Sequence, residues 1–238
     1  ATLTSVAQAG NFNAIASGAV IAGIGVTSTN NYNISYVGAV DTVTKAPLAI
    51  TVLGNYNGST SFTNSNSTIA IAGLVGSDVG NITVTGVTVS NSNVSANGSN
   101  YVSSIASTTG SNAANISNYL INTAYRAANS GVLAAGASNV LSPNAVTINT
   151  LPIVIIGANN TVSYSGVSQT NNGATVRING GSASTISGTT ISTGIGSQSI
   201  TLNGYATGTN SGTYSDSFSL SAGTGTTLSN YAVTYTNG

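Results

Sequence analysis

The sequence predicts an all-β protein built from tandem, β-sandwich-like modules. Three observations support this fold class. Short runs alternate apolar and polar residues with a period of two, and turns rich in Gly and Asn separate them at intervals of roughly 8–12 residues. Helix formers are scarce, because Glu is absent and Lys occurs once, while Thr, Ser, Val, Ile, Asn and Gly dominate the composition.

The predicted strands can be followed along the chain. Residues 69–72 and 82–85 alternate between β-branched and small or hydroxyl side chains. After Gly86 the alternation slips by one residue and resumes at Val87, which predicts a β-bulge or bend. Three further strands are predicted near the C-terminus, at residues 200–202, 218–220 and 231–235. The Ala- and Asn-rich segment 113–137 is the part of the sequence most compatible with a helix, and we interpret it as a strand followed by a loop.

Recurring dipeptides divide the chain into repeats. Three of the Asn-Tyr dipeptides, at residues 31–32, 118–119 and 230–231, are each followed by an alternating run, and we interpret them as closing signatures. Two similar openings, Ala46-Pro47-Leu48 and Leu151-Pro152-Ile153, each lead to a Tyr-x-Gly triplet. Each Pro lies where a strand would begin, a position at which its missing N–H is tolerated. The predicted organisation has four parts: a partial β module over 1–44, a β module over 45–126, a linker over 127–150 and a β module over 151–238.

The partial module needs strands from elsewhere. Residues 1–44 contain a closing signature without an opening one. We expect this module to be completed either by another region of a longer parent chain or by a neighbouring subunit. In the second case strands would be shared between subunits by β-strand addition.

These motifs resemble the MBG and YDG repeats of bacterial filamentous-haemagglutinin-type surface proteins. The resemblance is carried by Lys45-Ala46-Pro47-Leu48, by Tyr56-Asn57-Gly58-Ser59-Thr60, by the Gly/Asp turn at 73–78 and by Asn118-Tyr119. It implies a large, exported, repetitive protein displayed on Gram-negative-type cells as an adhesin or structural stalk, without catalytic residues. The sequence departs from the YDG pattern at Asn57, where the family has Asp, and in its scarcity of Lys.

The composition argues against catalysis and cofactor binding. The chain has no His, Cys, Met or Trp, so imidazole or thiolate metal sites and Ser–His or Cys–His nucleophiles cannot form. Its three carboxylates, Asp41, Asp78 and Asp216, are scattered, which disfavours a glycosidase pair or a calcium loop. We therefore predict that the protein is not an enzyme and has no catalytic, cofactor-binding or metal-binding residues.

Charge and hydropathy restrict the partners. Charged residues make up 3% of the chain, against about 25% in ordinary proteins, and the formal net charge is zero. Repulsion between copies is therefore weak, which favours self-association. The only cations are Lys45, Arg126 and Arg177, too few for a nucleic-acid footprint. No run of about 18 or more apolar residues is present, so no membrane-spanning helix is predicted.

The sequence allows two kinds of covalent modification. Asn-x-Ser/Thr sequons allow glycosylation, although many such triplets arise by chance in a chain so rich in Asn, Ser and Thr. The candidate residues are Asn33, Asn57, Asn66, Asn81, Asn93, Asn97, Asn115 and Asn159. The sole lysine, Lys45, could form an isopeptide crosslink to an Asn with Asp78 as the nearby acid; the simpler interpretation is an exposed linker lysine.

Two function classes remain open. The favoured one is a structural subunit or repeat segment of an extracellular bacterial filament or surface layer, with copies of itself as partner. The alternative is an adhesin stalk or glycan-binding module of a large secreted haemagglutinin-like protein, with host or surface glycans as partners. A second fold also remains open, a parallel β-helix, whose rungs would repeat every 20 residues or so, a period much shorter than the repeat found here.

Overall fold

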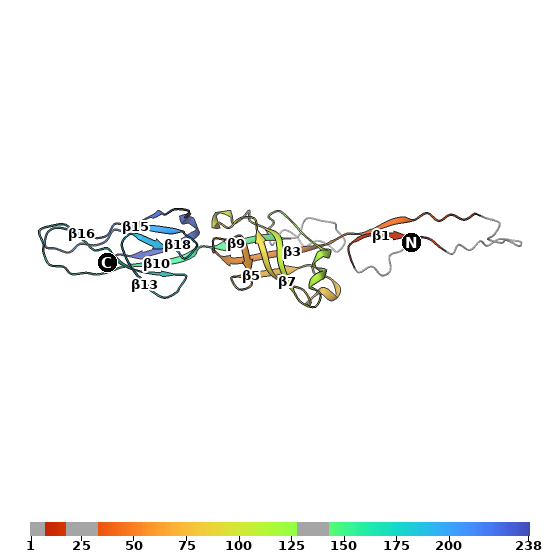
Figure 1. Ribbon diagram of the computed structural model, residues 1–238, viewed down its shortest axis with the longest axis horizontal. Coiled ribbons are helices and arrows are strands. Elements are labelled where there is room, and N and C mark those ends of the chain that lie inside the picture. Colours follow the sequence, from red (N-terminus) through yellow and green to blue (C-terminus); the bar gives the residue numbers. More distant parts are fainter. Residues whose placement is uncertain (1–7, 18–32, 128–142) are drawn as a thin grey trace.

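The structure is a computed structural model that describes residues 8–17, 33–127 and 143–238. Its strands confirm the all-β fold class, and they form several separate sheets with no closed barrel among the described strands. The parts follow one another along the long axis of the molecule (Figure 1). A two-stranded ribbon lies at one end, a middle module follows, and a C-terminal module occupies the other end.

The middle module consists of two sheets around the opening strand β3 (Ala46–Asn55). In the first sheet, β5 (Ser67–Ala72) pairs antiparallel with β3 on one side, and β8 (Tyr119–Ile121) and β9 (Asn144–Asn149) pair parallel with it on the other. The second sheet is antiparallel and contains β4 (Ser61–Thr63), β6 (Thr83–Val89) and β7 (Val102–Thr109). Three 3-10 helices connect these strands: η2 (Gly76–Asp78), η3 (Val94–Ala96) and η4 (Ala113–Asn118).

The C-terminal module repeats this plan around the opening strand β10 (Leu151–Gly157). Its first sheet has the order β13-β12-β10-β18, formed by β13 (Ser184–Ser187), β12 (Gly173–Ile178), β10 and β18 (Tyr231–Thr236). Its second sheet is β14 (Thr190–Ser192), β15 (Ser199–Asn203) and β17 (Ser219–Ala222). The 3-10 helix η5 (Leu228–Asn230) precedes β18, and a short pair, β11 (Gln169–Thr170) with β16 (Thr207–Gly208), lies at the far end (Figure 1).

The strand register gives the sequence repeat a structural basis. In the middle module Ala46, the residue before the opening Pro, pairs with Tyr119 of the closing signature. In the C-terminal module Leu151, again before the opening Pro, pairs with Tyr231. Both pairs are parallel. The opening and closing signatures therefore lie side by side on adjacent strands, in the same register in each module.

The interval 127–150, which we expected to be a linker, contains a strand of the middle module's sheet. Leu48 pairs with Ile121 of β8, and Ile50, two residues further along β3, pairs with Asn144 of β9. The closing strand is thus interrupted by residues 122–143, whereas β18 runs without interruption in the C-terminal module. The alternation of Asn144, Val146 and Ile148, all buried, keeps β9 in the sheet. Only Thr150 separates β9 from β10.

The buried side chains follow the predicted alternation. Along β10 every second residue is buried, with Ile153 and Ile155 fully enclosed. The predicted irregularity at Gly86 is confirmed, since the β6–β7 register shifts on both sides of that residue. Over 113–137 the structure has η4 and then β8, a 3-10 helix that the strand-plus-loop prediction missed, and residues 128–137 lie outside the described part. Apart from the parallel opening–closing pairs, the described sheets are antiparallel, which excludes the parallel β-helix alternative for the described residues.

The ribbon pairs β1 (Gly10–Ala14) with β2 (Ala39–Val43) antiparallel, and β2 runs directly into β3. Of the predicted partial module 1–44, residues 1–7 and 18–32 lie outside the described part. A lone two-stranded ribbon is marginally stable in water, because it has no hydrophobic face of its own to bury. Val40 is 62% exposed and Ile15, which follows β1, is 72% exposed.

Candidate functional site

The middle and C-terminal modules meet at a junction of aromatic, polar and apolar contacts. The Tyr-x-Gly triplet that follows β3 enters it from the middle module. The Tyr56 ring is 4% exposed and packs edge-to-face on Tyr231 of the C-terminal module, with ring centroids 5.5 Å apart. This arrangement places the electropositive edge of one ring against the face of the other, the favoured geometry for aromatic pairs.

A glutamine joins the two tyrosines. Nε2 of Gln198 donates to the Tyr56 hydroxyl oxygen at 2.9 Å, and the Tyr231 hydroxyl donates to Gln198 Oε1 at 2.6 Å. The Tyr231 hydroxyl oxygen also lies 3.1 Å from Oγ1 of the buried Thr193. Burial raises the pKa of Tyr231 above 10.0, its ordinary value. The junction therefore satisfies its buried hydroxyl groups internally, as a lasting protein interface requires.

The surroundings of Gly58 explain why the triplet ends in glycine. Its φ is +73°, in the left-handed region that glycine enters without strain. A Cβ atom at this position would lie 2.3 Å from Cγ2 of Ile195 in the C-terminal module. Only a residue without a side chain fits, because the neighbouring module approaches the backbone directly.

A second polar contact uses the closing signature. The side chain of Asn230, fully buried, accepts a hydrogen bond from the Val94 N–H at 2.9 Å and donates to Asn93 Oδ1 at 2.8 Å. Asn118 holds the equivalent position in the middle module. Its Oδ1 accepts the Ala9 N–H of the ribbon at 3.0 Å. In both cases the closing-signature Asn accepts a backbone N–H from the part of the chain that precedes its module.

The apolar core crosses the same junction. One cluster of buried side chains includes Ile50 and Phe62 of the middle module together with Ile153 and Ile200 of the C-terminal module. The two modules therefore share one apolar core, and a single residue connects β9 to β10.

The carboxylate of Asp78 stabilises the other end of the middle module. Its Oδ1 accepts hydrogen bonds from the side-chain amides of Asn115 at 2.8 Å and Asn112 at 3.0 Å, and its Oδ2 accepts the Tyr119 hydroxyl at 2.8 Å. These donors, that of Asn115 first and that of Tyr119 next, lower the pKa of Asp78 below 3.8. A small cavity of about 140 Å³ lies beside this cluster, between the ribbon and the module, and Asp78 and Tyr119 form part of its lining.

We expect the middle module to lose stability in acid through Asp78. A carboxyl group whose pKa is lowered by folding stabilises the folded state above its unfolded pKa, and this stabilisation is lost as the pH falls below 3.8. Asp78→Asn should lower the melting temperature at pH 7 and flatten its dependence on pH between about 2 and 5. Tyr119→Phe, which removes one donor, should shift the acid transition to higher pH. Thermal melts of the three proteins across this range test the expectation, and an unchanged acid slope in Asp78→Asn would contradict it.

The remaining charged candidates are not brought together. The Asp216 carboxylate is buried in the C-terminal module and accepts the backbone N–H groups of Ala206 and Gly238, at 2.8 and 2.9 Å. Lys45 is exposed, whereas Asp78 is enclosed by its amide and hydroxyl donors, which leaves the isopeptide hypothesis without a supporting contact. Asp41 lies on the ribbon. No group of three or more His, Cys, Asp or Glu residues that could hold a metal occurs in the described part of the chain.

The eight candidate glycosylation sites divide into three groups. The side-chain amide nitrogens of four donate hydrogen bonds within the fold: Asn57, Asn81, Asn97 and Asn115. Asn93 is half-buried at the module junction. The other three are exposed, and their amide nitrogens make no hydrogen bond to another described residue: Asn33, Asn66 and Asn159. These three are the positions where a glycan could be attached without breaking a contact.

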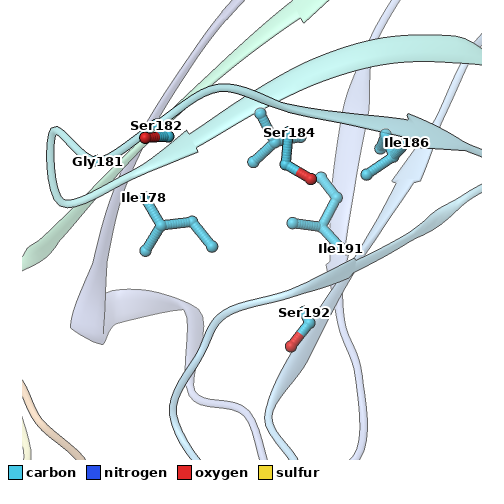
Figure 2. A pocket seen from close by; sticks show the side chains of 8 residues that line it. Ile178, Gly181, Ser182, Ser184, Ile186, Ile191 and Ser192 are labelled. Atoms are coloured by element: carbon cyan, nitrogen blue, oxygen red, sulfur yellow. The ribbon is translucent and has the colours of Figure 1, made fainter.

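A cleft of the C-terminal module has a volume of about 310 Å³ and lies between β12, β13 and β14. Ile178 and Ile191 lie across it from one another, and the hydroxyl groups of Ser182 and Ser192 lie at its rim (Figure 2). Its lining contains no ionisable side chain. Such a surface can hold an apolar or hydroxyl-bearing group, and it provides no acid or base for proton transfer.

Among the described residues, no helix has the length and apolar character needed to cross a bilayer. Comparison with known protein families, curated proteins and solved structures finds no match. The resemblance to MBG and YDG repeats therefore stays a prediction from the motifs, and the module junction is the feature on which a function can be argued.

Proposed function

We propose that this chain is a structural subunit or repeat segment of an extracellular bacterial filament or surface layer. The observation that carries the proposal is the module junction. Tyr56 and Gly58 of the first Tyr-x-Gly triplet meet the C-terminal module at this junction. Asn230 and Tyr231 of the last Asn-Tyr signature meet the middle module there. Residue types that recur in the sequence thus join these two modules. A repeat whose signature residues serve its end-to-end contacts is suited to an extended, load-resisting rod.

Electrostatics and the ribbon support the same function. A chain with 3% charged residues offers almost no repulsion between copies. Among the described strands, β1 and β2 pair only with each other, so further strands could join their outer edges, as in assembly by β-strand addition. Self-association through such contacts, outside the cell, is the function that these features favour.

Negative-stain electron microscopy of the native material tests the proposal. Long filaments of uniform width, or an ordered layer, are the expected result. Isolated particles at high protein concentration would overturn it.

The cleft of the C-terminal module favours a second candidate, an adhesin stalk or glycan-binding module. Its serine hydroxyls and isoleucine side chains could contact a sugar ring. Aromatic platforms, which commonly hold sugars, are absent from its lining, so this candidate is the weaker one. Binding of the chain to a glycan array, abolished by Ile178→Ala at the half-buried side of the cleft, would support it.

A further inference from the structure

The first and last strands of each module are bonded to each other and run in the same direction. The chain enters the middle module along β3 and leaves it along β9, and these two strands form six parallel residue pairs, over residues 50–55 of β3. It enters the C-terminal module along β10, and the closing strand β18 forms six parallel residue pairs with residues 151–156 of β10. The connection between the modules, from β9 to β10, is a single residue.

All four strands lie along the long axis of the molecule (Figure 1). A pull along this axis acts on the start of each opening strand and on the end of each closing strand. The two strands would then have to slide past one another, so the evenly spaced hydrogen bonds of the parallel ladder share the load and must break together. A pull across the strands would load only the outermost pair and open the ladder one pair at a time.

Hydrogen bonds and burial both oppose sliding. The ladder of the middle module is closed at its two ends, where the Ile50 N–H donates to the Pro143 carbonyl and the Tyr56 N–H to the Asn149 carbonyl, each at 2.8 Å. A shift by one residue would turn the inward side chains of a strand to the opposite face. The inward side chains of these strands include the buried Ile50, Val52, Val146, Ile148, Ile153 and Ile155.

A fully buried asparagine stands at the start of each closing strand that such a pull would load. Asn144 is the first residue of β9, and its side chain bonds the N–H and the carbonyl of Val102 in β7, at 2.7 and 2.8 Å. Asn230 comes directly before β18, and its side chain bonds the Val94 N–H at 2.9 Å and Asn93 Oδ1 at 2.8 Å. Each asparagine therefore ties the start of the loaded strand to an element that is not pulled with it.

We propose that these modules bear tension along the long axis, and that the parallel pairs β3–β9 and β10–β18 are the parts that resist it. We call each pair, together with its buried asparagine, a shear clamp. This inference rests on the proposed structural function and adds to it the kind of load that the assembly carries and the direction in which each module resists it.

Pulling one module in different directions tests the clamp. The chain has no Cys, so two introduced cysteines give unique handles for single molecules held at constant load. Asn149→Cys/Asn237→Cys loads β10 and β18 in shear. Asn149→Cys/Ser229→Cys pulls the two strand starts apart, Asn159→Cys/Asn237→Cys pulls the two strand ends apart, and both peel the ladder. All four positions are exposed, and each peeling variant shares one handle with the shear variant.

At equal load, the C-terminal module should survive at least about tenfold longer in shear than in either peeling geometry, which corresponds to a barrier higher by about 1.4 kcal/mol. Forced unfolding reports this barrier because the rate of unfolding governs it. Thermal melts of the three variants without load should agree, which would show that the handles leave the fold intact. Survival times that do not depend on direction, or that are longer in peeling, would overturn the clamp.

Asn230→Ala tests the buried asparagine by the same measurement. In the shear geometry it should shorten survival about fivefold, the effect of losing roughly one hydrogen bond. In the geometry that peels from the strand ends, survival should not change, because the pairs farthest from Asn230 break first. Equal shortening in both geometries would mean that Asn230 stabilises the fold without resisting the pull, and would remove it from the clamp.

The outcomes separate this inference from the function on which it rests. If survival does not depend on direction while the native material forms filaments, the clamp is wrong and the structural function stands. If the native material forms only isolated particles, the proposed function fails, and the single-chain measurement still decides whether the modules resist tension.

Discussion

Tyr56→Ala is expected to lower the free energy of unfolding by about 3–5 kcal/mol, the usual cost of truncating a buried aromatic side chain. The substitution removes a ring that is 4% exposed, its edge-to-face contact with Tyr231 and the hydroxyl that accepts from Gln198. Because the two modules share their apolar core across this ring, unfolding should also separate into two transitions. Urea denaturation followed by circular dichroism measures both effects.

The chain contains its own control for this substitution. Tyr164→Ala changes the same residue of the corresponding triplet, where the ring is 71% exposed. In the unassembled protein it should alter the free energy of unfolding by no more than about 0.5 kcal/mol, as substitutions at open surface positions usually do. Equal destabilisation by the two variants would mean that the junction does not distinguish them and would contradict the role given to Tyr56.

Asn144→Ala is expected to destabilise the middle module by roughly 2–4 kcal/mol, because it leaves buried backbone groups without partners. The Asn144 side chain is fully buried; its Oδ1 accepts the Val102 N–H at 2.7 Å and its Nδ2 donates to the Val102 carbonyl at 2.8 Å. The Nδ2 group also donates to the carbonyl of Asn122, where the closing strand is interrupted. Hydrogen exchange at the Val102 amide should accelerate in the variant, together with a lower midpoint of unfolding.

Asn149→Ala is the matched control for Asn144→Ala. Asn149 ends the same strand and is exposed, and its amide makes one long contact of 3.4 Å to Asn55. We expect a change of no more than about 0.5 kcal/mol. If Asn149→Ala were the more damaging of the two, the buried amide of Asn144 would not be what holds the interrupted strand in place.

Much of the fold could be predicted because its strands and turns follow local sequence patterns. The period of two identified β5, β6, β15, β17 and β18, and the slip after Gly86 identified a bulge. The Pro and Asn-Tyr signatures marked strands that the structure places side by side in register. These patterns can be recognised in a single sequence because alternating burial and turn chemistry act over a few residues.

The interrupted closing strand could not be predicted in this way. Residues 144–149 resemble any short β run, and nothing local indicates that they pair with β3 after the 22 residues that separate β8 from β9 in the sequence. Their place depends on contacts with residues far away in the sequence, above all the Asn144–Val102 pair. The predicted linker over 127–150 therefore includes strand β9.

The module junction was not predicted from the sequence. The Tyr-x-Gly triplet was noticed because it follows both opening signatures. Its partners Gln198, Thr193 and Ile195 belong to a turn of ordinary composition, and no repeat or spacing distinguishes them. Only the packing of one module on the next gives them a role.

The central claim is that this chain is a structural subunit or repeat segment of an ordered extracellular assembly, with its modules joined through the contact of Tyr56 with Tyr231. A reconstruction by electron cryomicroscopy of the assembled native protein tests it most directly. We predict a filament or layer of uniform repeat in which the Tyr56 ring is enclosed between the two modules of every copy. Native protein that forms no ordered assembly, or an assembly in which the modules separate and Tyr56 is open to solvent, would contradict the account.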